Sequence, residues 1–152
     1  AQEYIQELSR VLRYTLQGND SKSVTLRDEM EFVSAYIFLL KMRFEDNLSF
    51  DIRIDKQYDD HRLPPMAVQM LIENAVKHNE ISDRRPLSIR VYTEGEELVV
   101  TNPVQPKLTA TAGTGVGLAN LAKRYHLLYK CEIQITENKY FTVRIPLIPN
   151  AL

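Results

Sequence analysis

The sequence predicts an α+β fold, a two-layer α/β sandwich in which helices cover one face of a mixed, mostly antiparallel sheet, preceded by N-terminal helices. Two observations predict it. Up to about residue 46, apolar residues recur at helical spacing. From about residue 48, short runs that alternate between apolar and polar residues are mixed with further amphipathic segments. Helices packed on one face of such a sheet form a two-layer sandwich. We therefore divide the chain into a helical region, 1–46, and a sandwich domain, 47–152.

The composition is that of a soluble globular protein, with 44% hydrophobic and 26% charged residues among 152. A net charge of −1 provides no basic field, so we expect no nucleic-acid partner. The single Cys131 excludes an internal disulfide and is interpreted as buried filler in a reducing compartment. No apolar run reaches the roughly 18 residues of a membrane span. The chain opens in mid-pattern without Met, which indicates a fragment of a longer protein.

The N-terminal region is expected to form two helices. Residues 3–17 carry apolar side chains at helical spacing, and 18–23 have the composition of a loop. Thr25 followed by Asp28 is typical of a capping box that opens a second helix. That helix is apolar on two sides, so it needs two partners. We expect these to be the first helix and either a second domain or another subunit.

The later elements follow from periodicity and turn residues. Pro64-Pro65 suits the first turn of a helix that carries Asn74. Residues 103–115 are rich in Pro, Thr, Ala and Gly and are expected to form a long loop, which in a compact domain is usually functional. The expected strands are 48–54, then 87–92 and 98–101 joined as a hairpin through 94–97, and, after a helix at 116–129, a closing hairpin of 131–136 with 140–147.

The helix that carries Asn74 has an apolar and a polar side. At 100° per residue, Val68, Leu71, Ile72 and Ala75 face the sheet, whereas Glu73, Asn74 and Lys77 face away, with His78 on the border. The Asn carbonyl oxygen is a suitable ligand for Mg²⁺ that is already bound by phosphate oxygens. The Lys one turn on can neutralise phosphate charge. The alternative is an ordinary amphipathic helix with a solvated polar face.

A glycine-rich segment precedes the helix at 116–129. Gly113, Gly115 and Gly117 let backbone N–H groups approach phosphates without a Cβ in the way, and the following helix supplies its positive N-terminal end. Thr114 adds a hydroxyl donor. A flexible linker is the alternative, but an apolar helical stripe begins directly at Val116. Neither the dinucleotide fingerprint nor a GxxxxGK[ST] loop is present. Together, the Asn74 helix and this segment predict a site for ATP and Mg²⁺.

Several segments recur together in one known family. They are Leu8-Ser9 to Leu16, Leu26-x-x-Glu29 with Tyr36 and Arg43-Phe44, Leu63-Pro64-Pro65 through Glu73-Asn74-Ala75-Val76-Lys77-His78, and Gly113 through Arg124-Tyr125. The combination resembles the Bergerat-type (GHKL) ATP-binding fold and, more narrowly, the catalytic region of LytS/YehU-type sensor histidine kinases. The resemblance covers essentially the whole chain. It implies that 1–46 are part of a helical dimerisation region and 47–152 an ATP-binding catalytic domain.

The resemblance also implies roles for single residues. Asn74 would be the Mg²⁺ ligand and, with Glu73 and Lys77, would form the catalytic group. Lys77, His78 and Asn79 would line the phosphate and ribose side. The hinge and phosphate cradle of the nucleotide site would be formed by Gly113, Thr114, Gly115, Val116, Gly117 and Leu118.

The adenine end departs from the family pattern. Asn102 stands where the family has an Asp that accepts from the adenine amino group, and Thr142 matches a Thr that supports adenine through water. The segment 102–106 lacks the family's glycines, and its prolines stiffen that edge. A neutral acceptor forms a weaker hydrogen bond than a carboxylate. We therefore expect modest ATP affinity.

The phosphate end favours a kinase over a hydrolase. Met70, one turn before Asn74, occupies the place of a water-activating Glu in hydrolytic relatives, and a thioether cannot act as a base. Glu73 is available to orient Lys77 one turn on, or to contact an incoming histidine.

The family's phosphorylated histidine lies in a Pro-His-Phe-x-x-Asn-like motif, and His61, His78 and His126 all lack that context. The resemblance therefore implies transfer of the ATP γ-phosphoryl group to a histidine upstream of this fragment. It further implies a homodimeric full-length protein anchored in a bacterial inner membrane, of which this is a cytoplasmic part, and a response regulator of LytTR type. A degenerate pseudokinase that acts as a dimerisation module, a Bergerat-fold ATPase and a nucleic-acid-binding domain are the alternatives.

Overall fold

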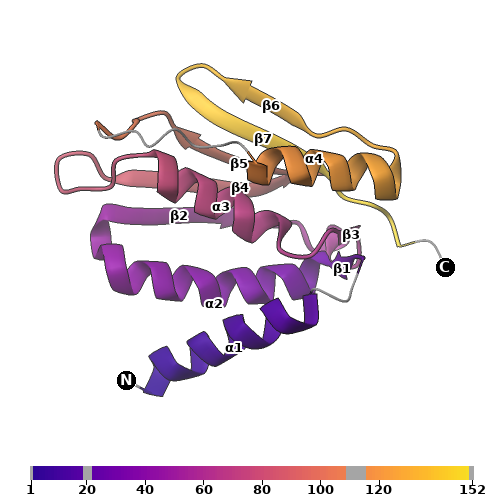
Figure 1. Ribbon diagram of the computed structural model, residues 1–152, viewed down its shortest axis with the longest axis horizontal. Coiled ribbons are helices and arrows are strands. Elements are labelled where there is room, and N and C mark those ends of the chain that lie inside the picture. Colours follow the sequence, from indigo (N-terminus) through magenta and orange to yellow (C-terminus); the bar gives the residue numbers. More distant parts are fainter. Residues whose placement is uncertain (1, 19–21, 109–115, 151–152) are drawn as a thin grey trace.

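A computed structural model describes residues 2–18, 22–108 and 116–150, without the side chains of 14–18. The helices are α1 (Gln2–Gly18), α2 (Leu26–Phe44), α3 (Ala67–His78) and α4 (Val116–Tyr129), and the strands are β1 (Val24–Thr25), β2 (Leu48–Arg53), β3 (Arg62–Leu63), β4 (Leu87–Glu94), β5 (Glu97–Pro103), β6 (Gln134–Glu137) and β7 (Tyr140–Pro146) (Figure 1). Short 3-10 turns occupy Glu45–Asn47 and Lys56–Tyr58. Among the described residues, no helix has the length and apolar character needed to cross a membrane.

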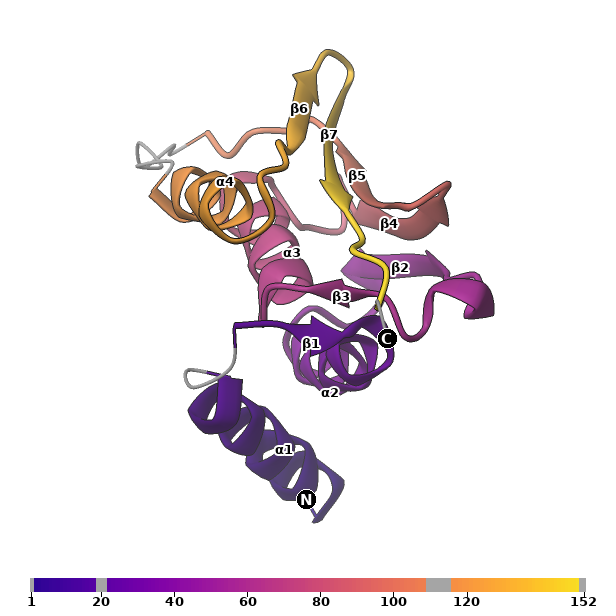
Figure 2. The same cartoon turned by 90° about the vertical axis from the view of Figure 1, so that its right-hand side faces the viewer.

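The predicted fold class is confirmed. The main sheet has the strand order β2-β4-β5-β7-β6. β2 runs parallel to β4, with Leu48 opposite Leu87, and every other neighbouring pair in this sheet is antiparallel. A parallel pair requires a crossover connection, and α3 provides it. Figure 2 shows α2, α3 and α4 along one side of the sheet, as a two-layer sandwich requires.

The core lies between these helices and the sheet. The predicted stripe of α3 is buried as expected, with Val68 and Ile72 fully enclosed and Leu71 and Ala75 nearly so. α4 adds Tyr125, which is fully buried and whose hydroxyl donates to the Pro146 carbonyl at 2.8 Å. This bond joins α4 to the end of β7. The burial of these apolar side chains removes them from water and holds the helices on the sheet.

α2 belongs to the same core. Leu26, Phe32 and Val33 are buried in one cluster with residues of α3 and the sheet. The Thr25 hydroxyl accepts from the Asp28 N–H at 3.2 Å, so the predicted cap is confirmed. α1 packs against α2 on its other side and projects from the rest of the molecule (Figure 2). The two partners predicted for α2 are therefore α1 and the sandwich. The domain boundary after residue 46 stays a prediction.

A small sheet was not predicted. β1 pairs with β3 in antiparallel fashion, and the Arg62 side chain reinforces the pairing. Its Nε donates to the Ser23 hydroxyl at 2.7 Å and its Nη2 to the Ser23 carbonyl at 2.9 Å. Strands of two residues show no alternation in the sequence, so no pattern could have revealed them.

Two predicted boundaries are wrong. Pro64 and Pro65 do not lie in the first turn of α3, because the helix begins at Ala67, after Met66 in a left-handed conformation. The closing hairpin begins at Gln134 rather than at Cys131. The chain needs the residues after α4 to reverse direction, starting from a left-handed Lys130. Cys131 is only half-buried and donates from Sγ to the Tyr129 carbonyl at 3.3 Å.

Candidate functional site

The outer face of α3 and the first turn of α4 enclose a hollow of about 180 Å³. Its lining residues are Met70, Glu73, Asn74, Lys77 and His78 of α3 with Val116 and Gly117 of α4, and we call it the α3–α4 hollow. Glu73 and Lys77 are exposed, whereas Asn74 and His78 are half-buried. The structure thus brings together residues from the two sequence segments that were predicted to form one site.

Gly117 permits the close approach of the two helices. A Cβ at this position would lie 3.2 Å from the Sδ atom of Met70. That distance is tighter than nine in ten real Cβ contacts, so a residue with a Cβ would require the Met70 side chain to shift by a few tenths of an ångström. Met70 therefore fills the space one turn before Asn74 with a group that has no acid–base chemistry.

The polar groups of the hollow are mostly uncommitted. Glu73 accepts from Gln69 Nε2 at 2.7 Å. Its role in orienting Lys77 or in contacting an incoming histidine stays a prediction. Within the part of the chain that the structure describes, Lys77 forms no ion pair. Its ammonium group is therefore available to a ligand.

A second, larger hollow of about 510 Å³ lies on the other side of α3, where that helix faces α2. Tyr36 and Arg43 of α2 line it together with Glu73 and Lys77. Burial, and after it the negative charge of Glu73, raises the pKa of the Tyr36 phenol above its ordinary value. Glu73 and Lys77 thus stand on the ridge between the two hollows.

Asn79 faces inward. Its side-chain oxygen accepts from the Gln105 N–H at 2.8 Å, and its Nδ2 donates to the Ala75 carbonyl at 2.8 Å. Both polar ends of the amide are therefore engaged within the protein, and Asn79 does not line the α3–α4 hollow. In this structure it fixes the end of α3 against the segment after β5. Its predicted nucleotide contact is not tested by this arrangement and stays a prediction.

Sequence reasoning missed Gln105. Its Nε2 lies 2.8 Å from the Glu80 carbonyl, 3.0 Å from the Arg85 carbonyl and 3.2 Å from the Pro86 carbonyl, to which it can donate. Its backbone carbonyl accepts from the Glu80 N–H at 2.7 Å. This one buried side chain organises the loop between α3 and β4. Because it stands in a proline-flanked stretch without periodicity, no signal in the sequence marked it.

Asn102 and Thr142, predicted for the adenine end, lie on the sheet. Asn102 is on β5, almost fully buried, and its Nδ2 donates to the Pro103 carbonyl at 2.8 Å. Thr142 is on β7, and its hydroxyl lies 2.7 Å from that of Thr101, its partner in the β5–β7 register. The predicted site residues therefore come from both layers of the sandwich.

The predicted phosphate cradle is described only in part. Gly113, Thr114 and Gly115 lie outside the described residues. Val116, Gly117 and Leu118 form the first turn of α4, with Val116 exposed. The first N–H groups of a helix have no partner within it, and they carry the positive end of the helix dipole. This end of α4 opens onto the side of α3 that carries Asn74.

The donor set suits a metal ion that arrives with a ligand. The described residues contain no group of three or more His, Cys, Asp and Glu side chains that could hold a metal ion. Mg²⁺ usually takes only one or two protein oxygens and completes its shell with phosphates and water. A single amide such as that of Asn74 is consistent with this mode of binding, and a metal cage made only of protein ligands is not.

The histidines outside the hollow have local partners. His61 packs edge-on against Tyr58, with ring centroids 5.1 Å apart, and lies 4.0 Å from Glu96. The Nδ1 atom of His126 lies 2.9 Å from a carboxylate oxygen of Glu132 on the surface. Neither histidine lines the α3–α4 hollow.

Comparison with known proteins identifies the family. The histidine kinase family model matches residues 1–48. The sensor protein LytS of Streptococcus agalactiae serotype V is 31% identical over 143 residues, which covers 82% of this chain and 24% of LytS. The sensor histidine kinase BtsS of Escherichia coli K12 is 31% identical over 157 residues, covering 96% of this chain and 28% of BtsS. This chain belongs to the sensor histidine kinases.

The fold is that of histidine kinase catalytic domains. The catalytic domain of histidine kinase ThkA superposes with a TM-score of 0.55 at 19% identity, covering 83% of this chain and 95% of ThkA's domain. The resemblance inferred from the sequence is thereby confirmed for the family and for the fold. The chain spans about a quarter of the length of the relatives it matches.

Proposed function

We propose that this chain is the ATP-binding catalytic region of a two-component sensor histidine kinase. The observation that carries the proposal is the α3–α4 hollow, where Asn74 and Lys77 meet the N-terminal turn of α4. An amide oxygen, a free ammonium group and a helix N-terminus are the groups that a magnesium-bound triphosphate needs. Sensor histidine kinase relatives over most of the chain support the same function.

The chain's residues would act by positioning and electrostatics. Asn74 would hold Mg²⁺, which when bound neutralises phosphate charge. Lys77 and the first N–H groups of α4 would bind phosphate oxygens and orient the terminal phosphoryl group. His78 would line the ribose side, and Asn102 and Thr142 would recognise the adenine. Met70 supplies no base, so these residues favour transfer to an incoming acceptor over transfer to water.

The acceptor and partners complete the proposal. The phosphoryl group would pass to a histidine in a segment that precedes this one and then to a response regulator of LytTR type. The full-length protein would be a homodimer anchored in the bacterial inner membrane, with this chain on its cytoplasmic side. Residues 47–152 would form the catalytic domain and residues 1–46 part of the helical dimerisation region, with α2 of that region packed into the core of the sandwich.

A degenerate pseudokinase that signals through dimerisation is the second candidate. The observation in its favour is the adenine end, where a buried, neutral Asn102 donates to the neighbouring Pro103 carbonyl. Such a residue offers adenine a weaker acceptor than a carboxylate would.

Titration of the 152-residue chain with ATP, with and without Mg²⁺, tests the proposal. We expect saturable, Mg²⁺-dependent binding, and we expect Asn74→Ala to abolish the Mg²⁺-dependent part because it removes the protein ligand. The control is Asn150→Ala, since Asn150 is an exposed asparagine outside the hollow. Absence of saturable binding at millimolar ATP would contradict both the kinase and the ATPase interpretations and would leave the pseudokinase.

A further inference from the structure

The N-terminus of α3 is capped by a residue of another helix. Met66, at the N-cap position, is left-handed with φ 67° and makes no side-chain hydrogen bond to the helix. Glu29 of α2 takes over this role. One carboxylate oxygen accepts from the Met66 N–H and the other from the Val68 N–H, each at 3.0 Å. Two donors at the start of α3 are thus satisfied from α2.

The carboxylate of Glu29 is fully buried. A buried side chain of this type is stable only where hydrogen bonds and positive potential replace its water. The N-terminus of a helix provides both, through unpaired N–H groups and through the helix dipole. The carboxylate of Glu29 and the first N–H groups of α3 therefore depend on each other, because each is the hydrogen-bond partner of the other in a buried site.

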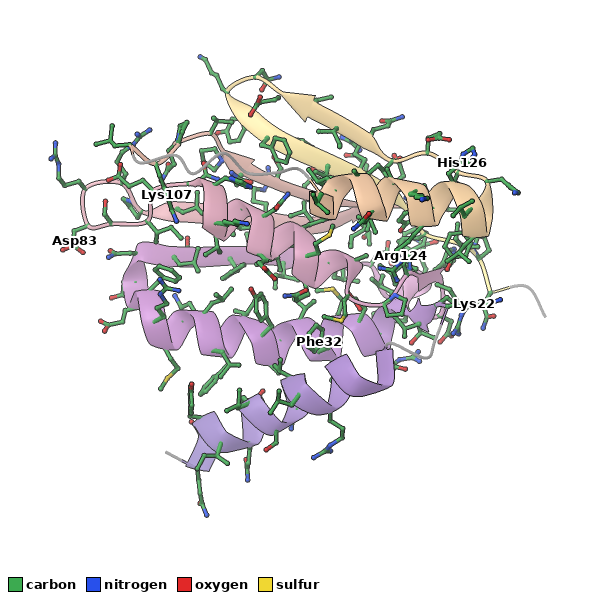
Figure 3. All side chains as sticks on the ribbon, viewed as in Figure 1. Lys22, Phe32, Asp83, Lys107, Arg124 and His126 are labelled. Atoms are coloured by element: carbon green, nitrogen blue, oxygen red, sulfur yellow. The ribbon has the colours of Figure 1, made fainter. Side chains whose placement is uncertain are left out.

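A second side chain holds the same turn from the opposite helix. Arg124 of α4, labelled in Figure 3, donates from Nη2 to the Pro65 carbonyl at 3.3 Å. Pro64 and Pro65 are buried, and proline restricts the backbone at this turn. The Pro65–Met66 turn is consequently fixed by α2 through its N–H side and by α4 through its carbonyl side. This gives Pro64-Pro65 a role in the turn before α3 in place of the first helical turn that the sequence predicted.

We infer that Glu29 is a positioning residue for the nucleotide site, an inference that rests on the proposed function. Asn74 lies six residues beyond Val68 on α3, about 9 Å along the axis at 1.5 Å per residue. Because α3 is one continuous helix, the carboxylate that fixes its start also fixes where Asn74 and Lys77 stand relative to α4. Glu29 thereby ties the placement of the magnesium ligand to α2, the helix on which α1 packs.

The decisive variant is Glu29→Gln. Glutamine has the same shape, but its NH₂ group replaces one acceptor oxygen, so one N–H group at the start of α3 faces a donor. Glu29→Asp keeps the carboxylate on a shorter side chain and serves as the conservative variant. Glu31→Gln is the matched control, because Glu31 is an exposed glutamate on the same helix. Leu48→Val, in the core at the start of β2, controls for a general loss of stability.

The first readout is the ratio of ATP affinities with and without Mg²⁺, measured well below the melting temperature of each variant. We expect Glu29→Gln to lower the affinity for Mg-ATP by on the order of tenfold, the size expected for a buried donor left without an acceptor. Its affinity for ATP alone should change less, since of the two positioned residues only Lys77 acts without Mg²⁺. Glu29→Asp should retain part of the Mg²⁺ dependence. The Glu31 and Leu48 variants should keep the wild-type ratio.

The second readout needs no nucleotide. Amide hydrogen exchange along α3 should accelerate by roughly tenfold in Glu29→Gln, and not in the Leu48 variant at matched stability. Unchanged exchange in α3, or a wild-type Mg²⁺ dependence in Glu29→Gln, would overturn the inference. If the wild-type chain binds no Mg-ATP, the proposed function is wrong, and the exchange measurement still decides whether Glu29 positions α3.

Discussion

Gln105 and Asn79 illustrate, at the scale of single residues, how buried amides order a loop beside the candidate site. Both are more than nine-tenths buried, and between them they bond to the end of α3 and to the loop before β4. An amide has two donors and an acceptor, so one side chain can satisfy several backbone groups at once. The loop is held without a regular element of its own.

Gln105→Ala is therefore expected to destabilise the chain by about 1 kcal/mol, because it leaves partly buried carbonyls without their donor. The loss should concentrate in the loop before β4, where trypsin should cut after Arg84 faster than in the wild type; the bond after Arg85 precedes Pro86 and resists trypsin. Gln134→Ala, at an exposed position on β6, is the control and should change stability by less than about 0.5 kcal/mol. Equal proteolysis of this loop in both variants would contradict the role assigned to Gln105.

Tyr125 predicts an alkaline limit to stability. Burial, and after it the neighbouring Tyr129, raises the pKa of the Tyr125 phenol well above its ordinary value of 10.0. The folded state thus keeps the proton that the unfolded chain loses above pH 10. The resulting stability is complete below pH 10 and is lost as the pH rises beyond it, by up to about 1.4 kcal/mol per pH unit.

Denaturation curves of the wild type and of Tyr125→Phe between pH 7 and 11 check this prediction. At pH 7 the variant should be less stable by about 1 kcal/mol, since it lacks the hydrogen bond to the Pro146 carbonyl. This difference in the free energy of unfolding should narrow above pH 10. The wild type loses stability there as Tyr125 ionises in the unfolded state, whereas phenylalanine has no proton to lose. A gap that is constant across this range would show that Tyr125 does not titrate on unfolding.

At this scale, the sequence predicted the residues that carry a recognisable pattern. Asn74 and Lys77 stand at helical spacing in a short motif, and the structure places both in the α3–α4 hollow. Glu29 was noted only as part of a resemblance, and Gln105 not at all. Their partners are backbone groups far along the chain. Every residue carries such groups, so the sequence does not show which of them a side chain will bind. The inward turn of Asn79 escaped prediction for the same reason.

Among the elements, α4 shows most clearly how local chemistry sets a boundary. It ends at Tyr129, and the next residue, Lys130, is left-handed with φ 56°. A left-handed conformation places the Cβ of an L-residue close to the carbonyl oxygen, whereas glycine adopts it without strain. Glycine is for this reason the usual residue directly after a helix.

Lys130→Gly should accordingly stabilise the chain by about 0.5–1 kcal/mol. The matched control is Lys123→Gly, which makes the same change at an exposed position inside α4 and should destabilise by about 1 kcal/mol. Thermal unfolding of the two variants measures both effects. Two changes of the same sign would show that the conformation at residue 130 does not govern the end of this helix.

Helices and strands whose apolar residues recur at a regular spacing were predictable, and elements without such a spacing were not. α4 spans the predicted 116–129 because its apolar stripe and the glycines before it mark both ends. β1 and β3 are too short for any alternation. The start of α3 was misplaced because Pro64-Pro65 is a common helix opening, whereas this helix begins only after a left-handed residue that a distant carboxylate supports.

For the whole molecule, the proposed function predicts binding without turnover. The isolated 152-residue chain, incubated with γ-labelled ATP and Mg²⁺, should neither become labelled nor release phosphate at a steady rate. The acceptor is expected in another segment, and Met70 cannot activate water. Gel autoradiography under alkaline conditions and a phosphate-release assay measure the two outcomes. Acid-labile label on the chain would show that one of its three histidines is an acceptor after all.

The parallel pairing of β2 with β4 has a consequence for the way the chain folds. Leu48 meets Leu87 only after the whole of α3 and the loops on either side of it have folded back. Closing so long a loop costs chain entropy before any contact compensates for it, and pairings between distant segments form slowly. The hairpin of β4 and β5 needs no such closure. We therefore expect folding to start from that hairpin, with β2 joining late, so that α2 and its buried carboxylate reach the start of α3 among the last events of folding.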